Sequence, residues 1–198
     1  MNEREIIYKT FAKLFNYPDD ELIEWIKSGV IAEFLELIEM EEAKIEERNQ
    51  WNKLNSKSDL LEVLQVEYTH LFISSFPTIP APLYKSFYED NEIMGSSIES
   101  LIDTYEKYGF EVSKTSNELP DNLVLQFEFA SLLIKDNVPL DEQYSFISEF
   151  ILSWTEKLEE KIIENANLDF YKDLLVTINK FLNNDIATNN TKLSRAEL

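Results

Sequence analysis

The sequence predicts an all-α protein, built as a single-domain helical bundle. Apolar residues recur at intervals of three and four over most of the chain, and no window shows the strict alternation of apolar and polar residues that is typical of a strand. No repeat with a period of about 30 to 45 residues is present, which argues against a solenoid. We expect the helical domain to cover residues 1–184, followed by a polar, flexible tail over residues 185–198.

The N-terminal part of the chain contains three apolar patterns with helical spacing. Pro18 ends the first helix, because proline cannot continue the ladder of backbone hydrogen bonds, and Asp19 can cap the second. These helices are expected over residues 6–15, 22–26 and 30–48, the last turning highly charged after residue 39.

A helix with one apolar stripe is expected from Leu60 to Phe72, with Asp59 and Glu62 spaced as a capping pair. It leads into a loop over residues 74–91 that contains three prolines and four aromatic residues. Prolines restrict the backbone, so such a loop can hold aromatic side chains near the surface without a sheet or helix to support it. We interpret this loop as a contact surface.

The second half of the chain predicts four further helices. Ser96 and Glu99 form a capping box for a helix that Gly109 ends in the left-handed conformation. Pro120 suits the first turn of the next helix, which is apolar on most sides and is therefore expected to be central to the core. Two more helices are expected around residues 144–163 and 168–182.

The charge balance favours a cationic partner. The chain has 38 acidic and 18 basic residues, which gives a formal net charge of −20. Nucleic acid is not expected as a partner, because its phosphates are bound mainly by lysine and arginine. The same field favours encounter with a basic peptide, although an acidic surface also serves solubility alone.

Missing residues and segments exclude several classes of function. The chain has no cysteine, so it cannot form disulfides, a thiolate nucleophile or a cysteine-ligated metal site. Its N-terminus lacks the pattern of an export signal, and no apolar run approaches the roughly 18 residues that cross a bilayer. We therefore expect a cytoplasmic protein without stable membrane insertion.

Three motifs resemble those of the TorD/DmsD-like chaperones, which mature molybdenum oxidoreductases. They are Glu67-Tyr68 with Leu71-Phe72, Pro82-Leu83-Tyr84-Lys85-Ser86-Phe87-Tyr88, and Leu119-Pro120-Asp121-Asn122-Leu123 running on to Glu128-Phe129. The motif that begins at Pro82 resembles the family's Pro-x-Tyr-x-Ser-x-Tyr loop, and the motif around Pro120 resembles its Pro-Asp-His helix start. Asn122 stands where the family usually has the histidine.

The resemblance implies a TorD-like chaperone fold, with occasional exchange of segments between subunits as a form of self-association. It also implies binding to the twin-arginine leader or N-terminal segment of the catalytic subunit of a molybdopterin oxidoreductase. The chaperone would hold this apoenzyme for cofactor insertion before export. Together with the aromatic loop, it gives these expected peptide-binding residues: Glu67, Tyr68, Phe72, Phe76, Pro82, Tyr84, Ser86, Tyr88, Pro120, Asp121, Asn122 and Glu128.

Several of these residues also have a structural interpretation. Tyr68 and Phe72 lie on an apolar stripe and fit the core. Asp121 can satisfy free N–H groups in the first turn of the helix that Pro120 opens, or it can line the peptide groove and pair with an arginine, and the two roles are compatible.

An enzyme is the main alternative from another class. Glu67 and His70 have the i, i+3 spacing of ligands in carboxylate di-iron bundles, but that site needs the motif twice and His70 is the only histidine. Any serine triad would also depend on His70. We expect no catalytic residue, cofactor or metal, and keep two alternatives: a small carboxylate/His metal-binding helical enzyme, and a structural assembly subunit of another complex.

Overall fold

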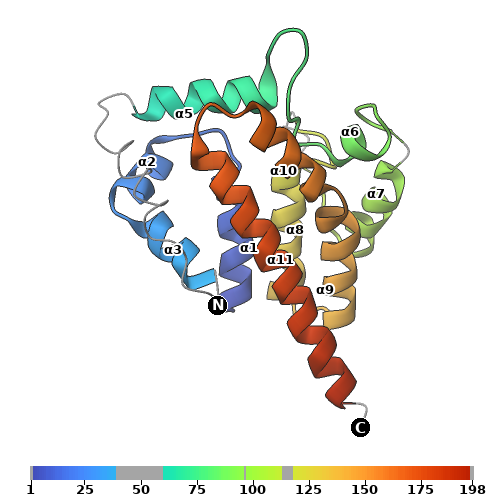
Figure 1. The fold of residues 1–198 in the computed structure, drawn as a ribbon. Helices are drawn as coiled ribbons and strands as arrows, with labels where there is room; N and C mark the ends of the chain where they lie inside the picture. The colour runs from blue at the N-terminus through green and yellow to red at the C-terminus, as the bar shows by residue number, and fades with distance from the viewer. Residues whose placement is uncertain (1, 39–59, 96, 113–117, 197–198) are drawn as a thin grey trace. The chain divides into compact units, whose positions relative to one another are not determined.

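The computed structural model describes residues 2–38, 60–95, 97–112 and 118–196, and every regular element in these ranges is a helix (Figure 1). The only β-type pairing that they contain is an isolated antiparallel bridge between Tyr84 and Asn122. The prediction of an all-α protein is confirmed.

The chain divides into two compact units, each made of two separate segments. The first unit contains Met1–Asn16 and Pro82–Leu158, and the second contains Tyr17–Ala81 and Glu159–Leu198. The chain therefore passes between the units three times, once inside the helix α10 (Ser153–Asn165). The predicted single domain over residues 1–184 stays a prediction.

Helix α8 (Leu123–Lys135) is the central helix of the first unit, as its apolar composition predicts. Helix α1 (Glu3–Leu14) packs along it, with the rings of Phe11 and Phe127 5.4 Å apart. The unit also contains α6 (Lys85–Glu89), α7 (Ile98–Lys107), α9 (Leu140–Phe146), the π-helical segment η2 (Ile147–Leu152) and the start of α10.

The second unit is built around the helix α5 (Leu60–Tyr68), which continues as a π-helical turn, η1 (Thr69–Ile73). Its aromatic core joins Tyr68, Phe72 and Tyr171, with ring centroids 4.9 Å apart for the first pair and 5.1 Å for the second. The remaining helices of the unit are α2 (Asp20–Lys27), α3 (Val30–Ile38), the end of α10 and α11 (Asp169–Ala196).

Two of the predicted helix ends are confirmed. The Leu22 N–H donates to Asp19 Oδ1 at 2.9 Å, which caps α2, and Gly109 has a φ of +69° just after α7. The charged stretch at 39–48 and the capping residues Asp59 and Ser96 lie outside the described residues.

Two segments differ from the sequence predictions. The loop over residues 74–91 contains the short helix α6, because its cap comes from a distant part of the chain. Helix α11 continues to Ala196, through the segment expected to be a tail, since no glycine or proline interrupts residues 169–196. The flexibility of that segment stays a prediction.

Candidate functional site

Two of the motifs meet in the first unit. The Lys85 N–H donates to the Asp121 carbonyl at 3.2 Å, and the Leu123 N–H donates to the Leu83 carbonyl at 2.9 Å. These bonds flank the bridge between Tyr84 and Asn122. We call Tyr84, Ser86, Glu118, Asp121 and Asn122 the Asp121 cluster.

Asp121 is fully buried, with 0% of its surface exposed. Its Oδ2 accepts a hydrogen bond from the Ser86 N–H at 2.8 Å, so this carboxylate caps α6. The prediction that Asp121 would cap the helix after Pro120 is therefore wrong. The side chain of Asp121 lies beside the first turn of α6 and accepts from an N–H group of that helix instead. The other oxygen, Oδ1, has no hydrogen-bond partner among the described residues. A buried oxygen without a partner is costly.

Asn122 caps α8 in place of Asp121. Its Oδ1 accepts from the Val124 N–H at 2.8 Å, and its Nδ2 donates to Glu118 Oε2 at 2.7 Å. The Tyr84 hydroxyl donates to the same Glu118 oxygen at 2.9 Å. Burial, and then the hydrogen bond to Glu118, raise the pKa of Tyr84 to about 12. The phenol is therefore a stable donor at neutral pH.

The neighbouring turn between α6 and α7 is tied to this cluster. Ser86 Oγ accepts from the Met94 N–H at 3.1 Å, and Met94 has a left-handed φ of 65°.

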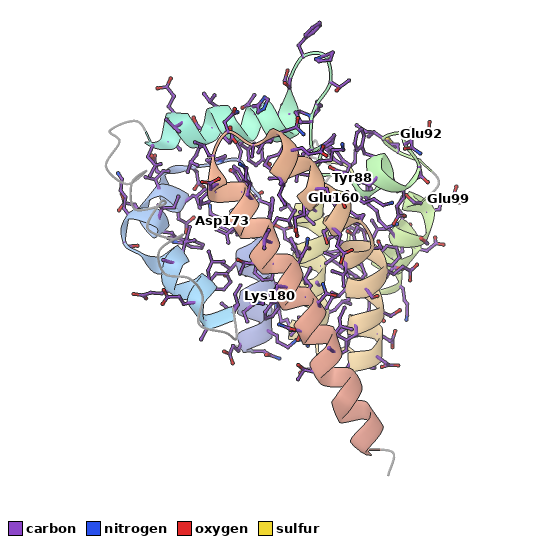
Figure 2. The ribbon with its side chains drawn as sticks, in the orientation of Figure 1. Tyr88, Glu92, Glu99, Glu160, Asp173 and Lys180 are labelled. Carbon is purple, nitrogen blue, oxygen red and sulfur yellow. The ribbon has the colours of Figure 1, made fainter. Side chains whose placement is uncertain are left out.

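Tyr88 stacks on Trp154 with ring centroids 5.3 Å apart, and burial raises the pKa of its phenol. Figure 2 shows Tyr88 together with Glu92 and Glu99, whose carboxylates point away from the helices.

The other predicted site residues of the first unit are Pro82, Pro120 and Glu128. Pro82 is buried and Pro120 is half-buried, with its carbonyl accepting from the Tyr105 hydroxyl at 3.0 Å. Burial raises the pKa of Tyr105, and the negative charges of Asp121 and Glu128 raise it further. Glu128 is half-buried, and burial raises the pKa of its carboxyl, opposed by Lys9.

The remaining predicted residues belong to the second unit, and three of them are buried. Tyr68 and Phe72 are core residues, as their stripe predicts. Glu67, 3% exposed, accepts from the backbone N–H groups of Asn167 at 2.7 Å and Leu168 at 3.0 Å. Its carboxylate therefore caps the turn between α10 and α11, a structural role. Phe76 is 96% exposed in the loop that follows η1 (Figure 1).

Glu118 is the residue of the cluster that sequence reasoning misses. Its polar neighbours in the sequence are typical of a linker. In the structure, its Oε2 accepts hydrogen bonds from both the Tyr84 hydroxyl and Asn122 Nδ2. Its position four residues before the cap of α8 is the one local signal. The bond to Tyr84 spans 34 residues and has no sequence signature.

The Glu67 and His70 pair is used within the fold. His70 Nε2 donates to the Asn165 carbonyl at 3.2 Å, so both side chains hold the turn between α10 and α11. Within the described ranges, no three His, Asp or Glu side chains come close enough together to hold a metal ion. None of the helices in the described part of the chain is both long enough and apolar enough to cross a bilayer.

Comparison with known proteins identifies relatives across most of the chain. The model of the nitrate reductase delta subunit family matches residues 31–160. The chain is 23% identical over 190 residues to a chaperone protein TorD from Actinobacillus pleuropneumoniae serotype 7 (strain AP76), covering 93% of this chain and 95% of that protein. It is 25% identical over 168 residues to a chaperone protein TorD from Aliivibrio fischeri (strain ATCC 700601 / ES114), covering 79% and 76%.

A solved structure agrees with these relatives. The fold matches the crystal structure of a proposed redox enzyme maturation protein from Archaeoglobus fulgidus with a TM-score of 0.61 and 26% identity, over 92% of this chain and 95% of that one. The predicted resemblance to the TorD/DmsD-like chaperones is confirmed. The chain belongs to the nitrate reductase delta subunit family.

Proposed function

We propose that this protein is a cytoplasmic, non-catalytic chaperone of a molybdopterin oxidoreductase. It binds the twin-arginine leader or N-terminal segment of the catalytic subunit and holds the apoenzyme for cofactor insertion before export. The TorD relatives, which are named as chaperones and align over most of the chain, support this function. The relative from Archaeoglobus fulgidus supports a role in redox enzyme maturation.

The observation that carries the proposal is the state of Asp121. Its carboxylate is buried at the meeting point of two motifs, and only one of its oxygens has a hydrogen-bond partner in the described residues. A native protein rarely leaves such a group unsatisfied without a reason. The guanidinium of an arginine has five N–H donors in a fork that matches a carboxylate, so a basic peptide would supply the missing partner.

The surroundings of Asp121 fit the same ligand. Glu118 is exposed and Tyr84 is half-exposed, and the Glu118 carboxylate accepts hydrogen bonds from the Tyr84 hydroxyl and the Asn122 amide. The net charge of −20 accelerates the encounter with a basic leader at low salt. Peptide binding by Glu67, Tyr68 and Phe72 would need these side chains to leave the buried positions they occupy, and an arginine likewise reaches the buried Asp121 carboxylate only when the segments that cover it move apart.

Calorimetry with a synthetic leader that carries two adjacent arginines tests the site. Tyr84→Ala and Asp121→Asn are expected to weaken binding by about tenfold each, with helical content retained by circular dichroism. Glu99→Gln, on the outer side of α7, is the control for lost charge and is expected to bind normally. Unchanged affinity in both Tyr84→Ala and Asp121→Asn would refute the assignment.

A further inference from the structure

The second unit contains an open pocket of about 400 Å³ that none of the predicted site residues lines. Glu62, Gln65 and Val66 line it from α5, and Tyr17 lines it from the segment before α2. We propose that this pocket binds one basic side chain, an arginine or a lysine, of a bound peptide. The proposed function supplies only the source of that peptide.

The walls of the pocket are held in place without a ligand. Gln65 Nε2 donates to the Pro18 carbonyl at 2.9 Å, which ties α5 to the segment that carries Tyr17. The Tyr17 ring meets Tyr68 edge-on, with centroids 5.4 Å apart and an interplanar angle of 82°. A site whose walls are already fixed loses little conformational entropy when it binds.

The end of the pocket is formed by the π-helical turn η1, which carries His70. The Asn165 carbonyl can only accept, so His70 Nε2 bears a hydrogen and donates it at 3.2 Å. In the neutral ring Nδ1 is then an acceptor, and the Ser75 hydroxyl lies 3.3 Å from it. π-Helical turns occur often at functional sites.

The charge of the lining selects a cation. Glu62 is exposed and is the only Asp or Glu among the described residues that line the pocket, and these described residues include neither lysine nor arginine. His70 Nε2 is already bonded to a backbone carbonyl. An anion such as a phosphate would therefore meet the Glu62 carboxylate without a lysine or arginine from the described lining, whereas a guanidinium or ammonium would pair with Glu62.

The apolar part of the lining fits the long stem of such a side chain. Val66 is 63% exposed and Tyr17 is 49% exposed, and both face the pocket. The methylene groups of arginine or lysine can cover Val66, and the charged head can lie against the ring of Tyr17 in a cation–π contact. An exposed valine beside a half-exposed tyrosine and a carboxylate is thus explained by one kind of ligand.

The experiment uses a small probe, so that it does not depend on the leader. Acetyl-arginine amide is titrated into the full chain labelled at its valine methyl groups, and acetyl-citrulline amide, a neutral isostere, is the matched ligand control. The Val66 methyl signals are expected to shift with the arginine probe, to shift much less with citrulline, and to lose the arginine response in high salt. Absence of a Val66 shift, or equal shifts with both probes, would overturn the proposal.

Variants connect the pocket to the peptide. Glu62→Gln is expected to lower the affinity for a leader with two arginines by about two- to fivefold. The affinity for the same leader with citrullines in place of the arginines is expected to stay unchanged. Glu24→Gln removes the same charge from an exposed position on α2 and is expected to change neither affinity. Equal effects of Glu62→Gln and Glu24→Gln on the arginine leader would also overturn the proposal. If the unaltered chain does not bind the leader at all, the proposed function is contradicted. The titration with acetyl-arginine amide still tests whether the pocket binds a basic side chain, because it does not depend on the leader.

Discussion

Replacement of Glu67 gives the sharpest test of how the second unit is held together. The carboxylate is 3% exposed and accepts three hydrogen bonds: from the N–H groups of Asn167 and Leu168, and from Asn167 Nδ2 at 3.1 Å. These partners lie 100 and 101 residues away in the sequence. The side chain therefore ties α5 to the turn between α10 and α11.

The magnitude follows from the number of bonds that water cannot replace. Asn167 is exposed, so its side-chain amide can turn to solvent, which leaves the two backbone bonds. Hydrogen bonds to a charged group contribute about 1.5 to 3 kcal/mol each, so Glu67→Ala is expected to lower the free energy of unfolding by about 3 to 5 kcal/mol. Glu67→Gln keeps an accepting oxygen but loses the charge, and is expected to cost about 1 to 2 kcal/mol.

Urea unfolding followed by circular dichroism measures both values. Glu62→Ala is the matched control for a charge lost from the same helix, because Glu62 is exposed in the first turn of α5 and its effect is expected to stay within about 1 kcal/mol. A loss for Glu67→Ala no larger than that for Glu62→Ala would refute the capping role. We expect the free energy of unfolding to be lowest for Glu67→Ala, higher for Glu67→Gln and highest for the unaltered protein. This order is expected for a carboxylate that accepts hydrogen bonds from buried N–H groups.

Three further outcomes follow from the first unit. Gly95→Ala is expected to lower the melting temperature, because the added Cβ would overlap the side chain of Asp90. Asp90 Oδ2 accepts from the Ser97 N–H at the start of α7, so a shift of Asp90 would disturb that contact. An unchanged melting temperature would contradict this packing. Asn122→Ala is expected to cost about 1 kcal/mol in urea unfolding through loss of the α8 cap, and a cost near zero would show that the cap is not needed. Burial raises the pKa of Glu128 in the folded state above its ordinary value of 4.5, so the folded protein binds the proton more tightly and stability should fall as pH rises through the range above 4.5. Glu128→Gln should remove this part of the pH dependence, and parallel stability curves for the two proteins would exclude it.

The sequence predicts the helices because their signals are local. The apolar positions of α8 recur within one helical turn of each other, and Asp19 and Gly109 act on residues within four positions along the chain. Each of these signals survives in the fold, since nothing distant competes with it. The class of fold and the core of the first unit could therefore be derived from the amino-acid order.

The roles of the buried carboxylates could not be derived in this way. Asp121 caps a helix 35 residues earlier, and Glu67 caps a turn 100 residues later. Local spacing suggested instead that Asp121 would cap the helix beside it, whereas the peptide-binding role of Glu67 was implied by the family resemblance and stays a prediction. A capping pair that is distant in sequence leaves no periodic pattern, so only the tertiary structure reveals which N–H groups each carboxylate serves.

The partners of the Asp121 cluster also explain how asparagine can replace the family histidine. Asn122 supplies a capping oxygen for α8 and an amide donor for Glu118, and both roles are performed by a neutral side chain. Ser86 and Tyr84 likewise reach the two carboxylates through a neutral N–H and a neutral phenol. None of these contacts brings a positive charge to the two carboxylates. A histidine at 122 would add a positive charge beside these carboxylates as the pH falls below its pKa, and would weaken the attraction for a cationic peptide. Asn122→His should therefore make the affinity for a basic leader fall more steeply on acidification than it does in the unaltered chain, and identical pH profiles of the two proteins would contradict this.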